Sequence, residues 1–181
     1  MQLIEKKESA SLNNRQFVFA FTLLFLLVLL RTAWISDDAA ITLRTVLNFI
    51  HGFGPTFNID ERVQAYTHPL WFFILSLGSL ISGNVFYTTF VISITVTIIS
   101  LGLLLNNISR NPFVLVLIGL AVVLSKAFVD FSTSGLENPL SHLLLLLAVL
   151  VASSHIEKGN DKLSIFFLIC SGLYLNRPDL L

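Results

Sequence analysis

The chain has 181 residues, of which 55% are hydrophobic and only 12% are charged, and its mean hydropathy is +0.83. A soluble domain carries about twice that share of charge, so the composition predicts a polytopic membrane protein. Eleven basic and eleven acidic residues cancel, which excludes a chain whose overall field would attract nucleic acid. The single cysteine, Cys170, has no internal partner and leaves the redox compartment undetermined.

The N-terminal tail, residues 1–16, is polar and precedes an apolar run over 17–35. At about 1.5 Å per residue, this run just crosses a hydrocarbon core of about 30 Å. A cleaved signal peptide is the alternative, but the long polar lead and the lack of a small-x-small site favour an uncleaved anchor. The tail has three basic residues, Lys6, Lys7 and Arg15. They predict a cytoplasmic tail and an outward-facing loop over 36–68.

The outer loop is predicted to begin with an amphipathic helix. Ser36 is suited to cap it, and the acids Asp37 and Asp38 then fall in its first turn, where they favour the positive helix end. One apolar stripe has helical spacing and consists of Leu43, Val46, Leu47 and Ile50, with Thr42, Thr45 and Asn48 off the stripe. The pattern predicts a helix lying on the membrane surface that ends at Gly52 and Gly54.

The rest of the chain alternates apolar runs with short connectors. The runs cover 69–82, 86–105, 112–125, 138–153 and 163–175, and with 17–35 they predict one transmembrane module over 17–181. Gly83-Asn84 predicts a tight connection between the first two of these runs. The abrupt end after Arg177-Pro178-Asp179 suggests a truncated chain.

The 112–125 run is short for a membrane span, and the topology depends on it. If it crosses, the segment 126–137 faces the cytoplasm. If it does not cross, that segment lies outside with the first loop, and Lys158 and Lys162 lie inside, which the positive-inside rule favours. Arg110 is expected outside in both cases.

Asp37 and Asp38 form the first candidate site. Two adjacent carboxylates at a membrane rim would deprotonate an acceptor hydroxyl or hold a divalent cation such as Mg²⁺ or Mn²⁺. Acids at a solvated helix start are the equally supported structural alternative.

Three further segments hold candidate residues. Arg62 and His68 would grip a phosphate, although a charged turn explains them better on the residues alone. Glu137 follows Ser134-Gly135-Leu136 and is either a cap-proximal charge or a second acid facing the first pair across a cavity. Arg177 would meet a lipid phosphate or simply anchor a helix end. The four histidines lack metal-ligand spacing, and His142 is expected to be packed.

These motifs together resemble one family. Asp37-Asp38-Ala39, Arg44, Gly52-Phe53-Gly54, Phe57-Asn58, Glu61-Arg62-Val63 and Tyr66-Thr67-His68-Pro69-Leu70-Trp71 stand in the order of the first outer loop of GT-C membrane glycosyltransferases. Within that superfamily, the chain is most similar to terminal arabinofuranosyltransferase-like and LphB-like bacterial proteins. Ser134-Gly135-Leu136-Glu137 and Arg177-Pro178-Asp179 match later motifs of the pattern. Ala40, Asp60 and Gln64 depart from it by replacing an aromatic residue, a glycine and an acid.

The resemblance implies a GT-C-like helix bundle in a bacterial inner membrane. It implies an inverting transfer of a sugar from a polyprenyl-phosphate donor to a glycan, lipid or protein acceptor on the outer face. Asp37, Asp38 and Glu137 are then the catalytic candidates, with Asp37 and Asp38 as ligands of a divalent metal. The candidates for binding the donor phosphate are Arg44, Arg62, His68 and Arg177.

Two other functions are weighed against the transferase. A non-catalytic remnant would bind a lipid-linked sugar or a partner subunit without turnover. A transporter or channel would require ionisable residues at mid-membrane and paired broken helices, whereas here the acids stand at the ends of apolar runs. The transporter is therefore the least supported of the three.

Overall fold

The computed structural model describes residues 2–61, 63, 65–158 and 162–180, with the side chains of 2–13, 157 and 158 excepted. Over these residues the chain is helical and has no strand, which confirms the predicted all-α class. The helices are α1 (Gln2–Thr32), α2 (Asp37–Ile50), α3 (Pro69–Ser82), α4 (Val85–Ile108), α5 (Pro112–Leu124), α6 (Lys126–Phe131), α7 (Asn138–Lys158), α8 (Leu163–Asn176) and the 3₁₀ turn η1 (Pro178–Leu180).

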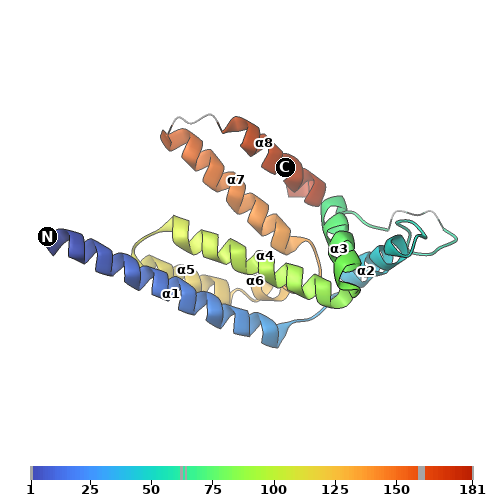
Figure 1. Ribbon diagram of the computed structural model, residues 1–181, viewed down its shortest axis with the longest axis horizontal. Helices are drawn as coiled ribbons and strands as arrows, with labels where there is room; N and C mark the ends of the chain where they lie inside the picture. Colours follow the sequence, from blue (N-terminus) through green and yellow to red (C-terminus); the bar gives the residue numbers. More distant parts are fainter. Residues whose placement is uncertain (1, 62, 64, 159–161, 181) are drawn as a thin grey trace.

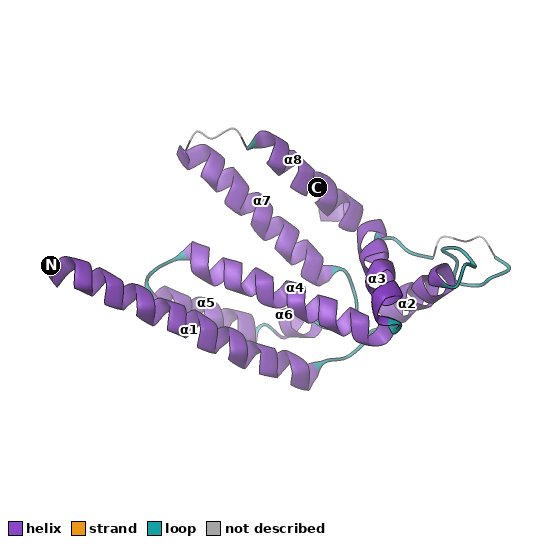
Figure 2. Cartoon of the chain, in the orientation of Figure 1, coloured by secondary structure: helices purple, strands orange, loops and turns teal. Residues whose placement is uncertain are grey.

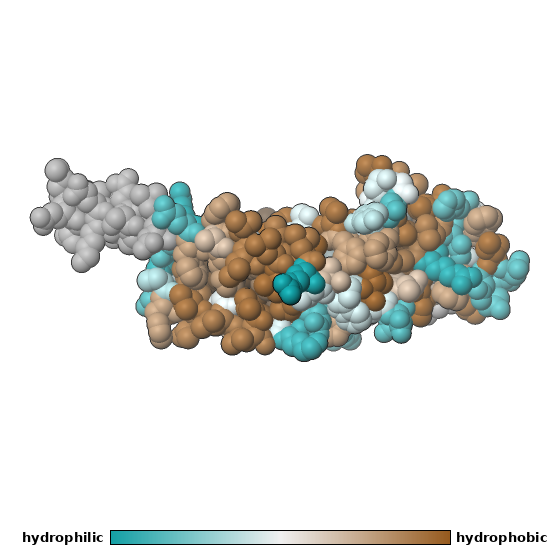
Figure 3. Space-filling model, turned by 90° about the horizontal axis from the view of Figure 1, so that it is seen from below, coloured by the Kyte–Doolittle hydropathy of each residue, from teal (hydrophilic) through white to brown (hydrophobic). Residues whose placement is uncertain are grey.

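Three stretches within the described residues are long and apolar enough to cross a membrane: Asn14–Thr32 in α1, all of α4, and Asn138–Ile156 in α7. α3, α5 and α8 are apolar but shorter. In Figure 3 hydrophobic residues cover most of the visible face, and hydrophilic residues are more frequent toward the end that carries the α2–α3 loop. The chain is therefore a multi-helix membrane protein.

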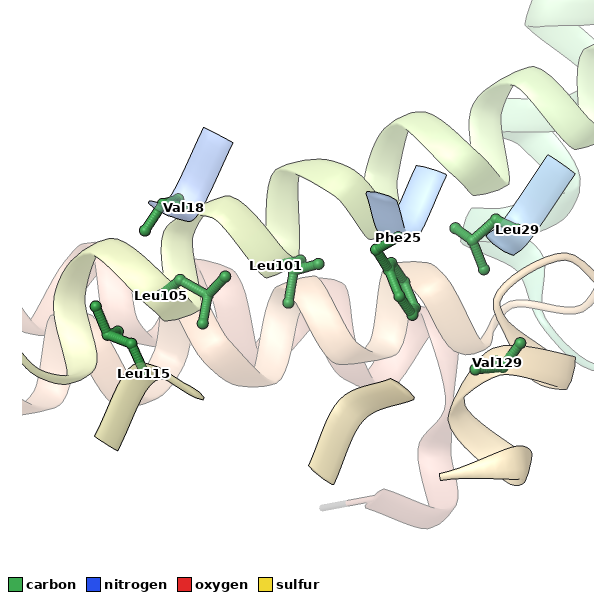
Figure 4. Packing of buried hydrophobic residues seen from close by; sticks show 7 residues of the cluster. All are labelled: Val18, Phe25, Leu29, Leu101, Leu105, Leu115 and Val129. Atoms are coloured by element: carbon green, nitrogen blue, oxygen red, sulfur yellow. The ribbon is translucent and has the colours of Figure 1, made fainter. Parts of the chain in front are cut away.

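The first hydrophobic core joins α1, α4, α5 and α6. Figure 4 shows side chains of these four helices pointing toward one another: Val18, Phe25 and Leu29 from α1, Leu101 and Leu105 from α4, Leu115 from α5 and Val129 from α6. A lipid tail is as apolar as a leucine, so these contacts stabilise the bundle mainly through close packing. Gly119 permits such an approach, because a Cβ there would lie 2.8 Å from the Phe21 ring.

A second core lies at one end of the bundle, where α2 and α3 pack on α7. Trp71, Phe72 and Leu75 of α3 are almost fully buried, and Leu43 and Val46 of α2 pack against them. The Tyr66 ring stacks on Phe72 with centroids 4.4 Å apart. This core fixes the α2–α3 segment against the bundle, which places the polar residues described below.

α2 forms as predicted, but its buried face is wider than the predicted stripe. Thr45, expected off the stripe, is fully buried, whereas Leu47, expected on it, is 39% exposed. The reason is that α2 contacts both α3 and α4. Thr45 tolerates burial because its hydroxyl donates to the Ile41 carbonyl at 2.9 Å.

The path of the chain differs from the predicted one. The amide of Asn14 donates to the Arg110 carbonyl at 2.6 Å, and the Trp34 indole donates to the Asp130 carbonyl at 3.0 Å. The α5–α6 segment therefore runs beside α1 along most of its apolar length (Figure 1). Arg110 consequently lies at the tail end of α1, and the expectation that it lies with the outer loop is wrong.

The position of α3 explains why the loop that contains Glu137 lies at the same end of the bundle as the loop before α3. In Figure 1, α3 stands across the end of the bundle, while α1, α4 and α7 run away from it. Gly83, with φ +73°, ends α3, and the Asn84 side chain caps α4 by accepting from the Tyr87 amide at 3.0 Å. Because α3 lies across the end, α4 carries the chain to the far end, and the α5–α6 segment brings it back beside α1. The expectation that the 112–125 run does not contribute to a crossing is therefore wrong.

α7 and α8 pack side by side and complete the bundle. Figure 2 shows α8 returning toward α3 after the connection that follows α7. The start of α7, the end of α8 and the start of α3 consequently meet at one end of the molecule, the same end as α2.

Candidate active site

The loop before α7 docks directly on the start of α2. The Ser36 amide donates to the Ser134 carbonyl at 2.9 Å, and the Trp71 indole donates to the Gly135 carbonyl at 3.0 Å. Gly135 has φ +85°, and a Cβ there would lie 2.8 Å from the Ala39 Cβ. Only glycine combines that conformation with that approach, which explains the glycine of the Ser134–Glu137 motif.

A cavity of about 340 Å³ lies at this junction. It is lined by residues of α2, of the segment before α3 and of the loop before α7: Asp38, Ile41, Thr42, Ala65, Tyr66, Thr67, His68, Leu136 and Glu137. Acids from distant parts of the chain, Asp38 and Glu137, therefore face one cavity, as the motif pattern predicts for a site with two acids.

A larger cavity of about 560 Å³ lies beside it and shares the segment 65–67. The described residues of its lining lie between Phe53 and Pro69, and none of these carries a charged side chain. The smaller cavity is therefore the better candidate for chemistry, because it brings carboxylates and an imidazole together.

Asp37 and Asp38 occupy the first turn of α2 and are both exposed. The Ser36 hydroxyl accepts from the Ala39 amide at 3.1 Å, which is the predicted N-cap. Asp38 lines the cavity and Asp37 is not among the lining residues. Of the two, Asp38 is therefore the acid placed to reach a molecule in the cavity.

Glu137 is in the opposite situation, since only 4% of the residue is exposed. Its Oε2 lies 3.4 Å from His68 Nε2, and its Oε1 lies 3.6 Å from Arg177 Nε. A buried carboxylate is costly unless it is paired, and Arg177 supplies the opposite charge.

His68 is held at both ring nitrogens. Its Nδ1 lies 2.8 Å from the Asn176 carbonyl oxygen. Because a carbonyl only accepts, Nδ1 must carry a proton and donate. Nε2 is left to face Glu137.

Arg177 is also fully engaged. Its Nε and Nη2 donate to the two carboxylate oxygens of Asp179 at 3.2 and 2.8 Å, and its Nη1 donates to Asn138 Oδ1 at 3.1 Å. The hydrogen bond that Arg177 donates to Asp179 is the main cause that raises the pKa of Arg177, with the Glu137 charge as a smaller one. The same hydrogen bond lowers the pKa of Asp179.

The other predicted phosphate ligands do not join this cluster. Arg44 donates to Asn58 Oδ1 at 3.2 Å and lies 4.4 Å from the Phe57 ring centroid, so it holds the loop after α2. It does not line the cavity. Arg62 lies outside the described residues.

Two residues of the site were not predicted. Asn176, fully buried, donates through its side-chain amide to the Glu137 carbonyl at 3.2 Å and to the Ser141 hydroxyl at 2.9 Å. Ser141 in turn donates to the Glu137 carbonyl at 3.3 Å. The signal that could have indicated Asn176 is its place at the end of an apolar run, directly before the Arg177 motif.

His142, one turn into α7, is packed as expected. Its ring stacks on Phe128 with centroids 5.1 Å apart. Within the described residues, no group of three or more histidine, cysteine or acidic side chains is close enough to hold a metal ion. Glu137 in particular already faces Arg177, and that cation would oppose a metal there.

The fold and the site thus define a multi-helix membrane protein with an acid-lined cavity at one end of its bundle. The chain is similar to curated proteins named terminal beta-(1->2)-arabinofuranosyltransferase. It is 32% identical to the one from Mycobacterium tuberculosis over 118 residues, which are 59% of this chain and 19% of that protein. It is 37% identical to the one from Corynebacterium glutamicum over 139 residues, which are 70% of this chain and 20% of that protein.

These comparisons confirm the resemblance that the motifs indicate. They concern only part of the relatives, because the chain spans about a fifth of the length of the curated relatives it matches. No protein-family model and no solved structure matches the chain.

Proposed function

We propose that this chain is a membrane glycosyltransferase, or the portion of one, that moves a sugar from a polyprenyl-phosphate donor to an envelope glycan, lipid or protein. The observation that carries the proposal is the cavity shared by Asp38 and Glu137 at one end of an apolar helix bundle. The similarity to arabinofuranosyltransferases supports a glycosyltransferase in general, and makes arabinofuranose the first donor sugar to test.

The reaction we propose is a single displacement at the anomeric carbon. The Asp38 carboxylate takes the proton of an acceptor hydroxyl, and the hydroxyl oxygen bonds to the anomeric carbon. The bond between that carbon and the phosphate oxygen breaks, and the polyprenyl phosphate leaves with the electron pair. The product has the inverted configuration, as the resemblance implies.

Arg177 is the described cation best placed to meet the donor phosphate. Its guanidinium already binds one anion, Asp179, through a two-pronged contact that suits a phosphate equally well. A donor phosphate would replace Asp179 there. Arg62, in the α2–α3 loop, stays a second candidate from the motif.

A divalent cation such as Mg²⁺ or Mn²⁺ is part of the proposal only at Asp37 and Asp38. Two adjacent exposed carboxylates provide hard oxygen ligands for it. Bound there, the cation would offset the negative charge of the donor phosphate.

The proposed orientation places the cavity on the outer face of the cytoplasmic membrane. Arg15 and Arg110 lie at the opposite end of the bundle, next to the contact between Asn14 and the Arg110 carbonyl. Lys162 lies at that end too, because it donates to Ser154, which shares a cavity with Asn107. Basic residues in short connections favour the cytoplasmic side.

A second candidate function is binding of a lipid-linked sugar without turnover. The similarity involves only a fifth of each relative. The activity in their names therefore belongs to longer proteins, and this chain matches only part of them. One experiment separates the two candidates: membranes containing the wild-type chain or Asp38→Asn are incubated with radiolabelled polyprenyl-phosphate arabinofuranose. Transfer that Asp38→Asn abolishes supports the transferase. Retention of the label on the purified chain without transfer supports binding alone, and equal transfer by both chains rules out the role of Asp38.

A further inference from the structure

We propose that His68 and Asn176 are positioning residues for Glu137, and that His68 acts on this carboxylate rather than on the donor phosphate. The inference rests on the proposed function for its effect on transfer. It corrects the role that the motif pattern gives to His68, and it gives Asn176 a role that the pattern does not contain.

The first argument concerns the two nitrogens of His68. Nδ1 donates to the Asn176 carbonyl at 2.8 Å, which fixes the rotation of the ring. Nε2 then lies 3.4 Å from Glu137 Oε2. A phosphate that approached Nε2 would also approach the Glu137 carboxylate, and two anions at that distance repel each other.

The second argument concerns Asn176, which connects three helices. Its side-chain amide donates to the Glu137 carbonyl and to Ser141, both at the start of α7. Its own carbonyl accepts from His68, the residue before α3. One residue at the end of α8 therefore fixes the backbone of Glu137 and, through His68, one of its carboxylate oxygens.

The third argument concerns what this arrangement does for the cavity. Glu137 is almost fully buried yet lines the same cavity as Asp38. Arg177 lies at Oε1 and His68 at Oε2, so the plane of the carboxylate is set from both sides. A charge that is held in place before the substrate arrives stabilises a transition state without reorganisation. Loss of His68 should therefore reduce kcat and leave donor binding unchanged.

The test uses two variants that each keep one of the two His68 contacts. The amide of His68→Asn occupies the Nδ1 position and keeps the contact with the Asn176 carbonyl, but it does not reach Glu137. The longer His68→Gln places its amide at the Nε2 position and keeps the contact with Glu137. Each variant of the chain is placed in lipid nanodiscs, and kcat and the KM for polyprenyl-phosphate arabinofuranose are measured.

We expect His68→Asn to lower kcat about 10- to 100-fold below His68→Gln, since a misplacement of about 1 Å costs about that much. The KM for the donor should stay within about twofold of the wild type in both. Asn176→Asp has the same shape but cannot donate to the Glu137 carbonyl, and its kcat should fall with that of His68→Asn. A raised KM with unchanged kcat in both His68 variants would make His68 a phosphate ligand and overturn the inference. Equal losses of kcat in both would overturn it as well.

A second measurement does not depend on transfer. Imidazole ¹⁵N NMR of the labelled chain, with the His68 signals assigned by their loss in His68→Gln, should show Nδ1 protonated. Glu137→Gln should shift the Nε2 signal, whereas Asp38→Asn should not. If the wild-type chain transfers no sugar, the proposed function fails. The spectrum still shows whether His68 Nε2 contacts Glu137. An Nε2 signal that ignores Glu137→Gln overturns the inference.

Discussion

The first turn of α2 and the loop before α7 bring acids to the same cavity in contrasting surroundings. Asp37 and Asp38 are exposed at a helix start, where the helix end and water stabilise their charges. Glu137 is buried and depends on His68 and Arg177 for its partners. An exposed acid is open to contact with a substrate hydroxyl, whereas a buried and paired acid is held in one orientation. The contrast predicts that Asp38 acts on the substrate and that Glu137 shapes the site.

Asp38→Asn gives the largest expected effect. Loss of a proton acceptor should lower kcat by about 10²- to 10⁴-fold, and loss of an exposed charge at a helix start should cost less than about 1 kcal/mol of stability. Asp37→Asn is the matched comparison: Asp37 does not line the cavity, so this variant loses only the proposed metal ligand and should retain more transfer. Both are measured by sugar transfer in membranes and by thermal unfolding in detergent. A larger loss for Asp37→Asn than for Asp38→Asn would contradict the assignment.

Gly135→Ala tests how closely the loop before α7 must approach α2. The new Cβ would lie 2.8 Å from Ala39 and 3.1 Å from Ile35, on a backbone with φ +85°. The left-handed conformation and the overpacking should together cost about 2–4 kcal/mol. Gly102→Ala is the control, because a Cβ on Gly102 meets nothing within 4 Å. Thermal unfolding should separate the two variants, and equal midpoints would refute the close approach.

Glu137→Gln tests the buried side of the comparison. The amide keeps the shape but removes the charge that Arg177 and His68 face, so a cost of about 1–3 kcal/mol is expected. Part of that cost is offset because Arg177 keeps Asp179. This variant should lose more stability than Asp38→Asn, as well as transfer. Unchanged thermal unfolding would mean that the buried charge is not needed for the fold.

Arg44→Gln should have a smaller effect. Arg44 is exposed, and its contacts with Phe57 and Asn58 hold the loop after α2. Loss of an exposed cation–π contact costs about 0.5–1 kcal/mol. Arg44→Lys should restore part of it, because a lysine keeps the charge over the ring. If Arg44 binds the donor phosphate instead, the KM for the donor would rise in Arg44→Gln without any loss of stability.

The sequence predicts the helical runs of this chain better than their path through the bundle. The Ser36 cap, the turn at Gly83 and the end of α2 near Gly52 follow from local chemistry, and the structure contains all three. Whether a short run such as α3 or α5 crosses is not a local property. It depends on which helices lie beside it, and so Arg110 was placed at the wrong end.

The candidate site shows the same division between local and distant information. The motifs around Asp38 and Glu137 point to acids from two segments, and a cavity does join them. The role of Asn176 depends on a contact with Glu137 that joins residues 39 positions apart, and no spacing in one sequence reveals such a contact. The exposure of Asp38 and the burial of Glu137 likewise depend on packing. The contrast between the two acids is therefore a finding of the structure.

The smallest expected effect concerns pH and the pair formed by Arg177 and Asp179. The hydrogen bond from Arg177 lowers the pKa of Asp179 in the folded chain. Unfolded chains lack that bond, so the stabilisation is present above the ordinary carboxyl pKa of about 3.9 and is lost as pH falls through the lower folded value.

Thermal midpoints recorded from pH 6 downward should therefore fall slightly more for the wild type than for Asp179→Asn. Asp60→Asn, which removes an exposed acid from the α2–α3 loop, is the control and should follow the wild type. Because Asp179 is exposed, the difference should shrink in high salt. A difference that salt does not reduce would show instead that Asp179 is shielded from solvent.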